Sequence, residues 1–187
     1  MIAQGILHLL TGYDHLAFLF VALLAVVRRH DVNDLRPLST AMVESLKVIT
    51  AFTVAHSITL TLAATGLVLL PSKGIEASIA ATVAITALSG FWRPMRFHGW
   101  PLAASFGLIH GFGFAGALAE VMGGKASAAG IGAFNVGIEL AQISVALALV
   151  PLLYLLAKRG AFEKFYAPAI SALVGGVALA SFVERLA

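Results

Sequence analysis

His8, Asp14 and His15 lie within one apolar stretch, Gly5 to Val27, where ionisable side chains are costly to bury. On insertion scales, an Asp, Lys or Arg at the centre of a membrane helix costs about 2.5 to 3.5 kcal/mol, so ionisable residues there normally face a polar interior. Imidazole and carboxylate groups bind divalent transition metals, and they also carry protons. The stretch therefore predicts a metal site or a proton-transfer path inside a membrane.

Three later apolar stretches each carry one comparable residue, namely His56, His110 or Glu139. The chain has no cysteine and four methionines, which excludes thiolate sites and leaves little for a sulfur-lined Cu(I) path. We therefore predict a shared site for Ni, Co, Zn, Fe or Cu(II). Its candidate metal ligands are His8, Asp14, His15, His56, His110 and Glu139.

The spacing in the first stretch gives a geometric expectation. On a continuous helix, residues seven apart share a face, so His8 and His15 should line one stripe about two turns, roughly 10 Å, apart. Asp14 should point about 100° away from His15. We expect Asp14 to orient an imidazole of a neighbouring span or to bind the metal itself. His8 should lie nearer the outside, as the recruitment point.

Polar side chains recur at three- and four-residue steps in two of the other stretches. One stripe holds Thr50, Thr53, His56, Ser57 and Thr59, and the other holds Asn135, Glu139 and Gln142. Such stripes either wall a polar interior or hydrogen-bond one membrane helix to another. For the hydroxyl groups we favour helix-to-helix bonding, whereas a carboxylate in lipid indicates function.

The composition places the chain in a membrane. Hydrophobic residues make up 60% and charged residues 11%, and the mean hydropathy is +0.97. A soluble domain carries about 25% charged residues. The net charge is +3, but the basic residues lie between apolar stretches, where they set orientation. Nucleic acid is therefore not an expected partner, whereas the lipid bilayer is.

We predict an all-α bundle of six transmembrane helices that forms a single transmembrane domain over residues 1–187. The expected spans are Gly5 to Val27, Lys47 to Leu70, Gly74 to Trp92, Pro101 to Val121, Ile131 to Ala157 and Phe165 to Val183. Pro71, Pro94 and the Gly123–Gly124 pair fall at or between the expected ends, whereas Pro151 and Pro168 lie inside spans.

Basic residues are unequally divided between the two sides of this bundle. One side holds nine, namely Arg28, Arg29, Arg36, Lys47, Arg93, Arg96, Lys158, Arg159 and Lys164, against Lys73, Lys125 and Arg185 on the other. The positive-inside rule then puts both termini in the periplasm. The first span lacks a basic flank and a small-residue cleavage site, so we expect it to be retained.

Small residues form a four-residue ridge in the fourth expected span, at Ala103, Gly107, Gly111 and Ala115. This pattern predicts close helix packing. Residues 111–116 also match G-x-G-x-x-G, but no strand precedes them and they lie within a membrane span, so we reject a dinucleotide site.

The first stretch, with its His8-x5-Asp14-His15 pattern, resembles the signature of the HupE/UreJ proteins, which are hydrogenase and urease accessory membrane proteins. Further matching stretches are Thr50–Ser57, Phe106–Gly116 and Phe134–Leu140. The resemblance implies a six-span permease of the bacterial inner membrane for nickel or a related divalent ion, with His8, Asp14 and His15 as transport residues.

One part of the chain departs from the nickel-associated members of that family. Of their second signature, F-H-G-x-A-H-G-x-E, only His110 and Gly111 remain, with Phe106 or Phe114 where the other histidine would fall. The chain therefore resembles the second branch of the family. His56 and Glu139 are candidates to replace the missing ligands.

Three functions fit these residues. The leading hypothesis is a gradient-driven or passive permease for a divalent transition-metal ion, and no nucleotide-binding loop is present to suggest ATP hydrolysis. The second is an intramembrane zinc hydrolase, in which three histidines hold zinc and Asp14 or Glu139 acts on a bound water. The third is a membrane subunit that delivers metal to a metalloenzyme or accessory partner without transporting it.

Overall fold

The computed structural model describes residues 1–28, 35–68, 70–88, 99–116, 118, 127–159 and 161–186. Throughout these ranges the secondary structure is helical, and they contain no strand. The predicted all-α class is therefore confirmed. Arg29, Arg93, Pro94, Arg96, Gly123, Gly124 and Lys125, and the expected span ends Trp92 and Val121, lie outside the described residues.

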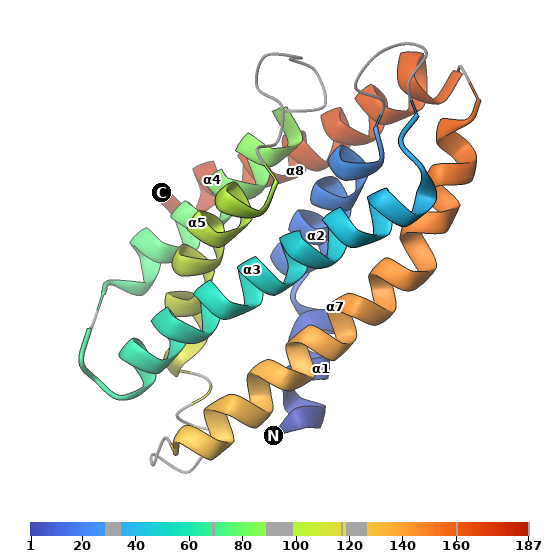
Figure 1. The fold of residues 1–187 in the computed structure, drawn as a ribbon. Coiled ribbons are helices and arrows are strands. Elements are labelled where there is room, and N and C mark those ends of the chain that lie inside the picture. Colours follow the sequence, from blue (N-terminus) through green and yellow to red (C-terminus); the bar gives the residue numbers. More distant parts are fainter. Residues whose placement is uncertain are drawn as a thin grey trace.

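The helices pack lengthwise into one bundle, with α3 and α7 antiparallel and side by side (Figure 1). In chain order the elements are α1 (Ile2–Thr11), α2 (Tyr13–Val27), α3 (Leu38–Ala64), α4 (Ser72–Leu88), α5 (Trp100–His110), the 3-10 turn η2 (Gly111–Phe114), α7 (Ala128–Ala157), the π-helical turn η3 (Phe162–Tyr166) and α8 (Ala167–Leu186).

Three described segments are long and apolar enough to cross a bilayer, namely α3, α7 and the continuous segment Phe162–Leu186. The pair formed by α1 and α2 adds a fourth if it is one broken span. The chain is thus a helical, multi-pass membrane protein.

The first expected span is not one helix, so the prediction of a continuous helix from Gly5 to Val27 was wrong. The chain bends by 76° between α1 and α2, and Gly12 lies at the bend. The Gly12 N–H still donates to the His8 carbonyl at 2.9 Å. A Cβ at Gly12 would lie 2.8 Å from that carbonyl oxygen and 2.9 Å from Nδ1 of His15, so a larger residue would collide with both.

Other expected boundaries also shift. The second span, α3, begins at Leu38 rather than at Lys47. The regular helix of the fourth ends at His110 and continues as η2. Ahead of α8, the Ala167 N–H bonds to the Phe162 carbonyl in a wider π turn. Pro168 follows immediately, and a proline has no N–H for the ordinary helical bond.

The predicted small-residue ridge is confirmed as a close contact between α5 and α3. Ala103, Gly107, Gly111 and Ala115 are all buried. A Cβ on Gly107 would overlap the Phe52 carbonyl oxygen, and one on Gly111 would overlap the His56 carbonyl oxygen. The backbones of the two helices therefore touch beside His56 and His110.

A second close contact joins α1 to α7. A Cβ on Gly5 would overlap the Phe134 carbonyl oxygen, and one on Gly137 would overlap the Ile2 carbonyl oxygen. These glycines hold the short helix α1 against the long helix α7.

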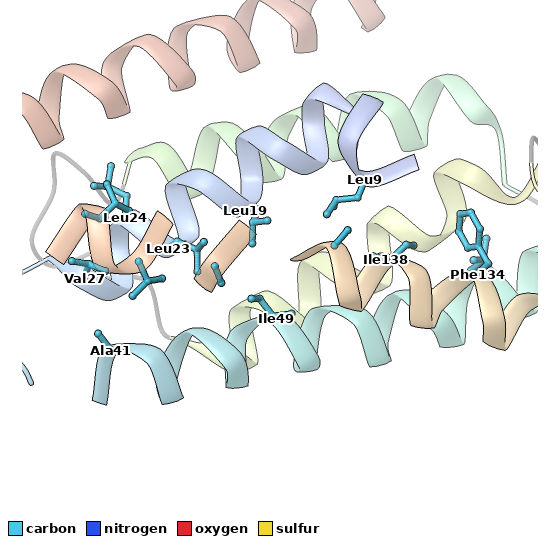
Figure 2. Packing of buried hydrophobic residues seen from close by; sticks show 14 of the residues in the cluster. Leu9, Leu19, Leu23, Leu24, Val27, Ala41, Ile49, Phe134 and Ile138 are labelled. Carbon is cyan, nitrogen blue, oxygen red and sulfur yellow. The ribbon is translucent and has the colours of Figure 1, made fainter. Parts of the chain in front are cut away.

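The larger apolar core fills the space between α1, α2, α3 and α7. Figure 2 shows its side chains converging from these helices. The labelled members are Leu9, Leu19, Leu23, Leu24, Val27, Ala41, Ile49, Phe134 and Ile138. This packing fixes α1 and α2 relative to α3 and thereby positions the histidines that they carry.

Gly107→Ala should destabilise the protein, whereas Gly176→Ala should not. Alanine favours a helix over glycine by up to about 1 kcal/mol, and nothing lies within 4 Å of a Cβ on Gly176. At Gly107 the added methyl would strike the backbone of α3, and overpacking costs about 1 to 3 kcal/mol. Thermal unfolding of the detergent-solubilised protein measures both. Equal midpoints for the two variants would contradict the close contact.

Candidate metal centre

Three histidines from three helices converge in the interior. His8 lies on α1, His15 on α2 and His56 on α3. One ring nitrogen of each lies within 4.8 Å of the other two. Because metal–nitrogen bonds are about 2.1 Å long, two nitrogens on one ion lie at most about 4.2 Å apart, so small movements of these rings would let all three bind one ion. We call His8, His15 and His56 the three-histidine group.

The bend at Gly12 creates this convergence. The ring centroids of His8 and His15 are 4.6 Å apart, so the predicted separation of two helical turns was wrong. Across this bend of 76°, the His8 ring of α1 packs edge to face against the His15 ring of α2. His8 therefore belongs to the group and does not lie two turns away as an outer recruitment point.

Asn135 on α7 fixes the orientation of His56. The Asn135 side-chain NH2 donates to the Ile131 carbonyl at 3.0 Å. The other amide atom, Oδ1, lies 3.2 Å from Nδ1 of His56 and must accept from it. Nδ1 therefore carries the hydrogen, and in a neutral ring Nε2 presents a bare lone pair. A hydrogen bond to the far nitrogen is also how proteins orient a metal-binding histidine.

His110 lies next to the three-histidine group without belonging to it. It is the last residue of α5 and is fully buried. Its ring centroid is 5.1 Å from that of His15. Nε2 of His110 lies 2.9 Å from the hydroxyl of Thr82 on α4.

Each of these four histidines has a buried ring nitrogen with no hydrogen-bond partner among the described residues. The atom is Nε2 in His8, His15 and His56, and Nδ1 in His110. A buried donor or acceptor left unsatisfied costs about 1 to 3 kcal/mol. Imidazole nitrogens are ligands that suit divalent transition-metal ions such as Zn, Cu, Fe and Ni.

Aromatic rings enclose the histidines. The ring of Phe114 lies 3.7 Å from His8, measured between centroids, and that of Phe52 lies 5.2 Å from His110. Phe134 and Phe18 complete these contacts at 5.4 Å from His8 and 5.7 Å from His110. The surroundings are thus apolar, which strengthens any interaction between an imidazole and a cation.

Asp14 precedes His15 but contacts an arginine instead of the group. One carboxylate oxygen of Asp14 lies 2.7 Å from Nη2 of Arg185 near the end of α8. Nη1 of Arg185 donates to the Glu76 carbonyl at 2.8 Å. The ion pair is partly exposed, and it ties the first turn of α2 to α4 and α8.

Glu139 also lies apart from the three-histidine group. Its carboxylate accepts a hydrogen bond of 2.7 Å from the Thr50 hydroxyl. It lines a groove of about 350 Å³ between α3 and α7. Asn135 lines the same groove, and the His56–Asn135 hydrogen bond is therefore the direct link between the groove and the group.

A family model described as HupE / UreJ protein matches residues 1–185 of this chain. The chain belongs to the HupE/UreJ family. Neither the curated proteins nor the solved structures yielded a match. In this HupE/UreJ protein the recognised pattern of His8, Asp14 and His15 spans the bend, with its histidines in the group and its aspartate in the ion pair.

Two contacts at the centre of this HupE/UreJ protein could not be predicted from its sequence. Thr82 and Arg185 lie far along the chain from their partners, His110 and Asp14. A hydroxyl in a membrane helix is common, and Arg185 counted only as a basic residue near a span end. The sequence did point to Asn135, because it lies one helical turn before Glu139 in a polar stripe.

Asn135→Leu should lower Ni(II) affinity about 10- to 100-fold, the usual effect of removing the partner that orients a ligand. Isothermal titration of the purified protein measures it. Gln142→Leu is the matched control, because Gln142 accepts a hydrogen bond from Thr53 on α3 and has no hydrogen bond to a histidine in the described part of the chain. Equal losses in both variants would mean that the polar stripe only holds α3 to α7.

Proposed function

We propose that this protein is a permease for a divalent transition-metal ion, nickel or a related one, in the bacterial inner membrane. The observation that carries the proposal is the convergence of His8, His15 and His56, with His110 beside them, through buried nitrogens that lack a partner in the described chain. Membership of the HupE/UreJ family supports metal handling.

The set of available ligands favours transport of the ion over its permanent binding. The three-histidine group offers neutral imidazoles, and Asp14 and Glu139 are bonded to Arg185 and Thr50. Without a carboxylate in contact, a divalent charge in an apolar interior is only partly compensated. A transport site must bind its ion strongly enough to admit it and weakly enough to release it. On this proposal Asp14, His110 and Glu139 are contacts along the path.

We further propose six passes with both termini in the periplasm and a single transmembrane domain. The α4 segment and the α5–η2 segment would form the two passes beyond the four counted above. The excess of basic residues in the connections after spans one, three and five supports this orientation.

The zinc hydrolase remains the main competitor because three convergent histidines also suit catalytic zinc. Hydrolysis further requires a general base near the ion. The two candidate carboxylates are engaged elsewhere, Asp14 with Arg185 and Glu139 with Thr50. This separation favours the permease. Metal delivery to a partner enzyme remains an outcome of the test.

Proteoliposomes containing the intact chain should take up Ni(II), or one of Co(II), Zn(II), Cu(II) and Fe(II), along an imposed gradient. His15→Ala and His56→Ala should each lower the initial rate at least about 10-fold, because ligand loss exceeds the effect of losing an orienting partner. Ser144→Ala is the control, since that exposed hydroxyl donates to the Leu140 carbonyl of its own helix.

Unchanged uptake in both histidine variants would overturn the proposed site. Absence of uptake by the intact chain, combined with zinc-dependent hydrolysis of lipid or peptide, would favour the hydrolase. Absence of uptake with co-purification of a metalloenzyme would favour delivery. Elution volume and thermal midpoint of each variant check that it is folded.

A further inference from the structure

His110 is a buried histidine that does not belong to the three-histidine group. It is fully buried at the point where α5 gives way to η2. Its Nδ1 has no hydrogen-bond partner in the described part of the chain. The tight contact of Gly107 and Gly111 with α3 fixes the backbone on both sides of it.

Thr82 determines which nitrogen of His110 is bare. A threonine hydroxyl has one hydrogen to donate, and the Thr82 hydroxyl donates it to the Ile79 carbonyl at 2.7 Å. Its oxygen can then only accept from Nε2 of His110, at 2.9 Å. Nε2 carries the hydrogen, and in the neutral ring Nδ1 presents its lone pair. In His56 the bare nitrogen is the opposite one, Nε2.

The His15 ring packs against His110 as well as against His8 and His56. Its ring centroid is 4.6 Å from His8 and 6.1 Å from His56. It is 5.1 Å from His110, with the rings edge to face at 84°. Phe18 and Phe52 pack against His110, so apolar rings flank this pair.

We propose that His15 and His110 form a second position for a divalent transition-metal ion, and that Thr82 is the positioning residue of His110. This inference rests on the proposed permease function. The ion keeps His15 as a ligand while it exchanges His8 and His56 for His110. The second position has two imidazole ligands where the three-histidine group has three, so its hold on the ion is weaker.

The first experiment compares Ni(II) uptake by Thr82→Val and Thr82→Ser in proteoliposomes. Valine keeps the shape and removes the hydroxyl, so uptake should fall about 10-fold or more, while serine should restore it to within about 2-fold. Thr53→Val is the matched control, because Thr53 and Thr82 are each 3% exposed, but the Thr53 hydroxyl contacts the Ile49 carbonyl and Gln142. Its uptake should stay within about 2-fold of the intact chain, since the lost bonds involve no ligand.

The second experiment reads the His110 ring directly. In the full chain labelled with 15N-histidine, the Nδ1 of His110 should give the signal of an unprotonated nitrogen, and Thr82→Val should alter that signal while Thr82→Ser retains it. Zn(II) should shift the signals of His15 and His110 even in the His8→Ala/His56→Ala double variant, where the three-histidine group is dismantled.

The outcomes separate this inference from the function on which it rests. If the intact chain takes up metal but Zn(II) leaves the His110 signal unmoved in the double variant, the second position is wrong and the permease stands. If Thr82→Val and Thr53→Val lose uptake equally, Thr82 has only a packing role. If the intact chain takes up no ion, the permease itself fails.

Discussion

Burying nitrogens that have no partner is the cost that the rest of this structure must offset. The hydrocarbon core of a bilayer holds no water to satisfy a polar group, and each unsatisfied ring nitrogen costs about 1 to 3 kcal/mol. His8, His15, His56 and His110 all carry this cost within one region. The surrounding helices must therefore supply enough packing to hold the four rings together.

Glycines supply much of that packing. Gly107 and Gly111 let the backbone of α5 touch that of α3, and Gly5 with Gly137 does the same for α1 and α7. Gly12 permits the bend that sets His8 beside His15. The chemistry of the centre is carried by imidazoles, but its geometry depends on residues that have no side chain.

The sequence was sufficient to predict the class of the fold, and the three histidines of the group are among its six candidate ligands. Three features can be recognised directly in the sequence: the apolar stretches, the histidines within them and the Ala103–Gly107–Gly111 ridge. The bend at Gly12 was not, because helical periodicity assumes a continuous helix and glycine is common in membrane helices. The same limit hid the partners of Asp14 and His110, since Arg185 and Thr82 meet them only after distant helices pack.

The origin of the histidines in separate helices has a thermodynamic consequence. Because α1, α2, α3 and α5 each contribute a single ring, the complete set of nitrogens exists only while the bundle is assembled. A metal ion that binds there must stabilise the folded chain by mass action, by about 2.7 kcal/mol at a free concentration 100 times its dissociation constant. The bound ion would then act as a transient cross-link, and the protein would be most resistant to unfolding when the ion is bound.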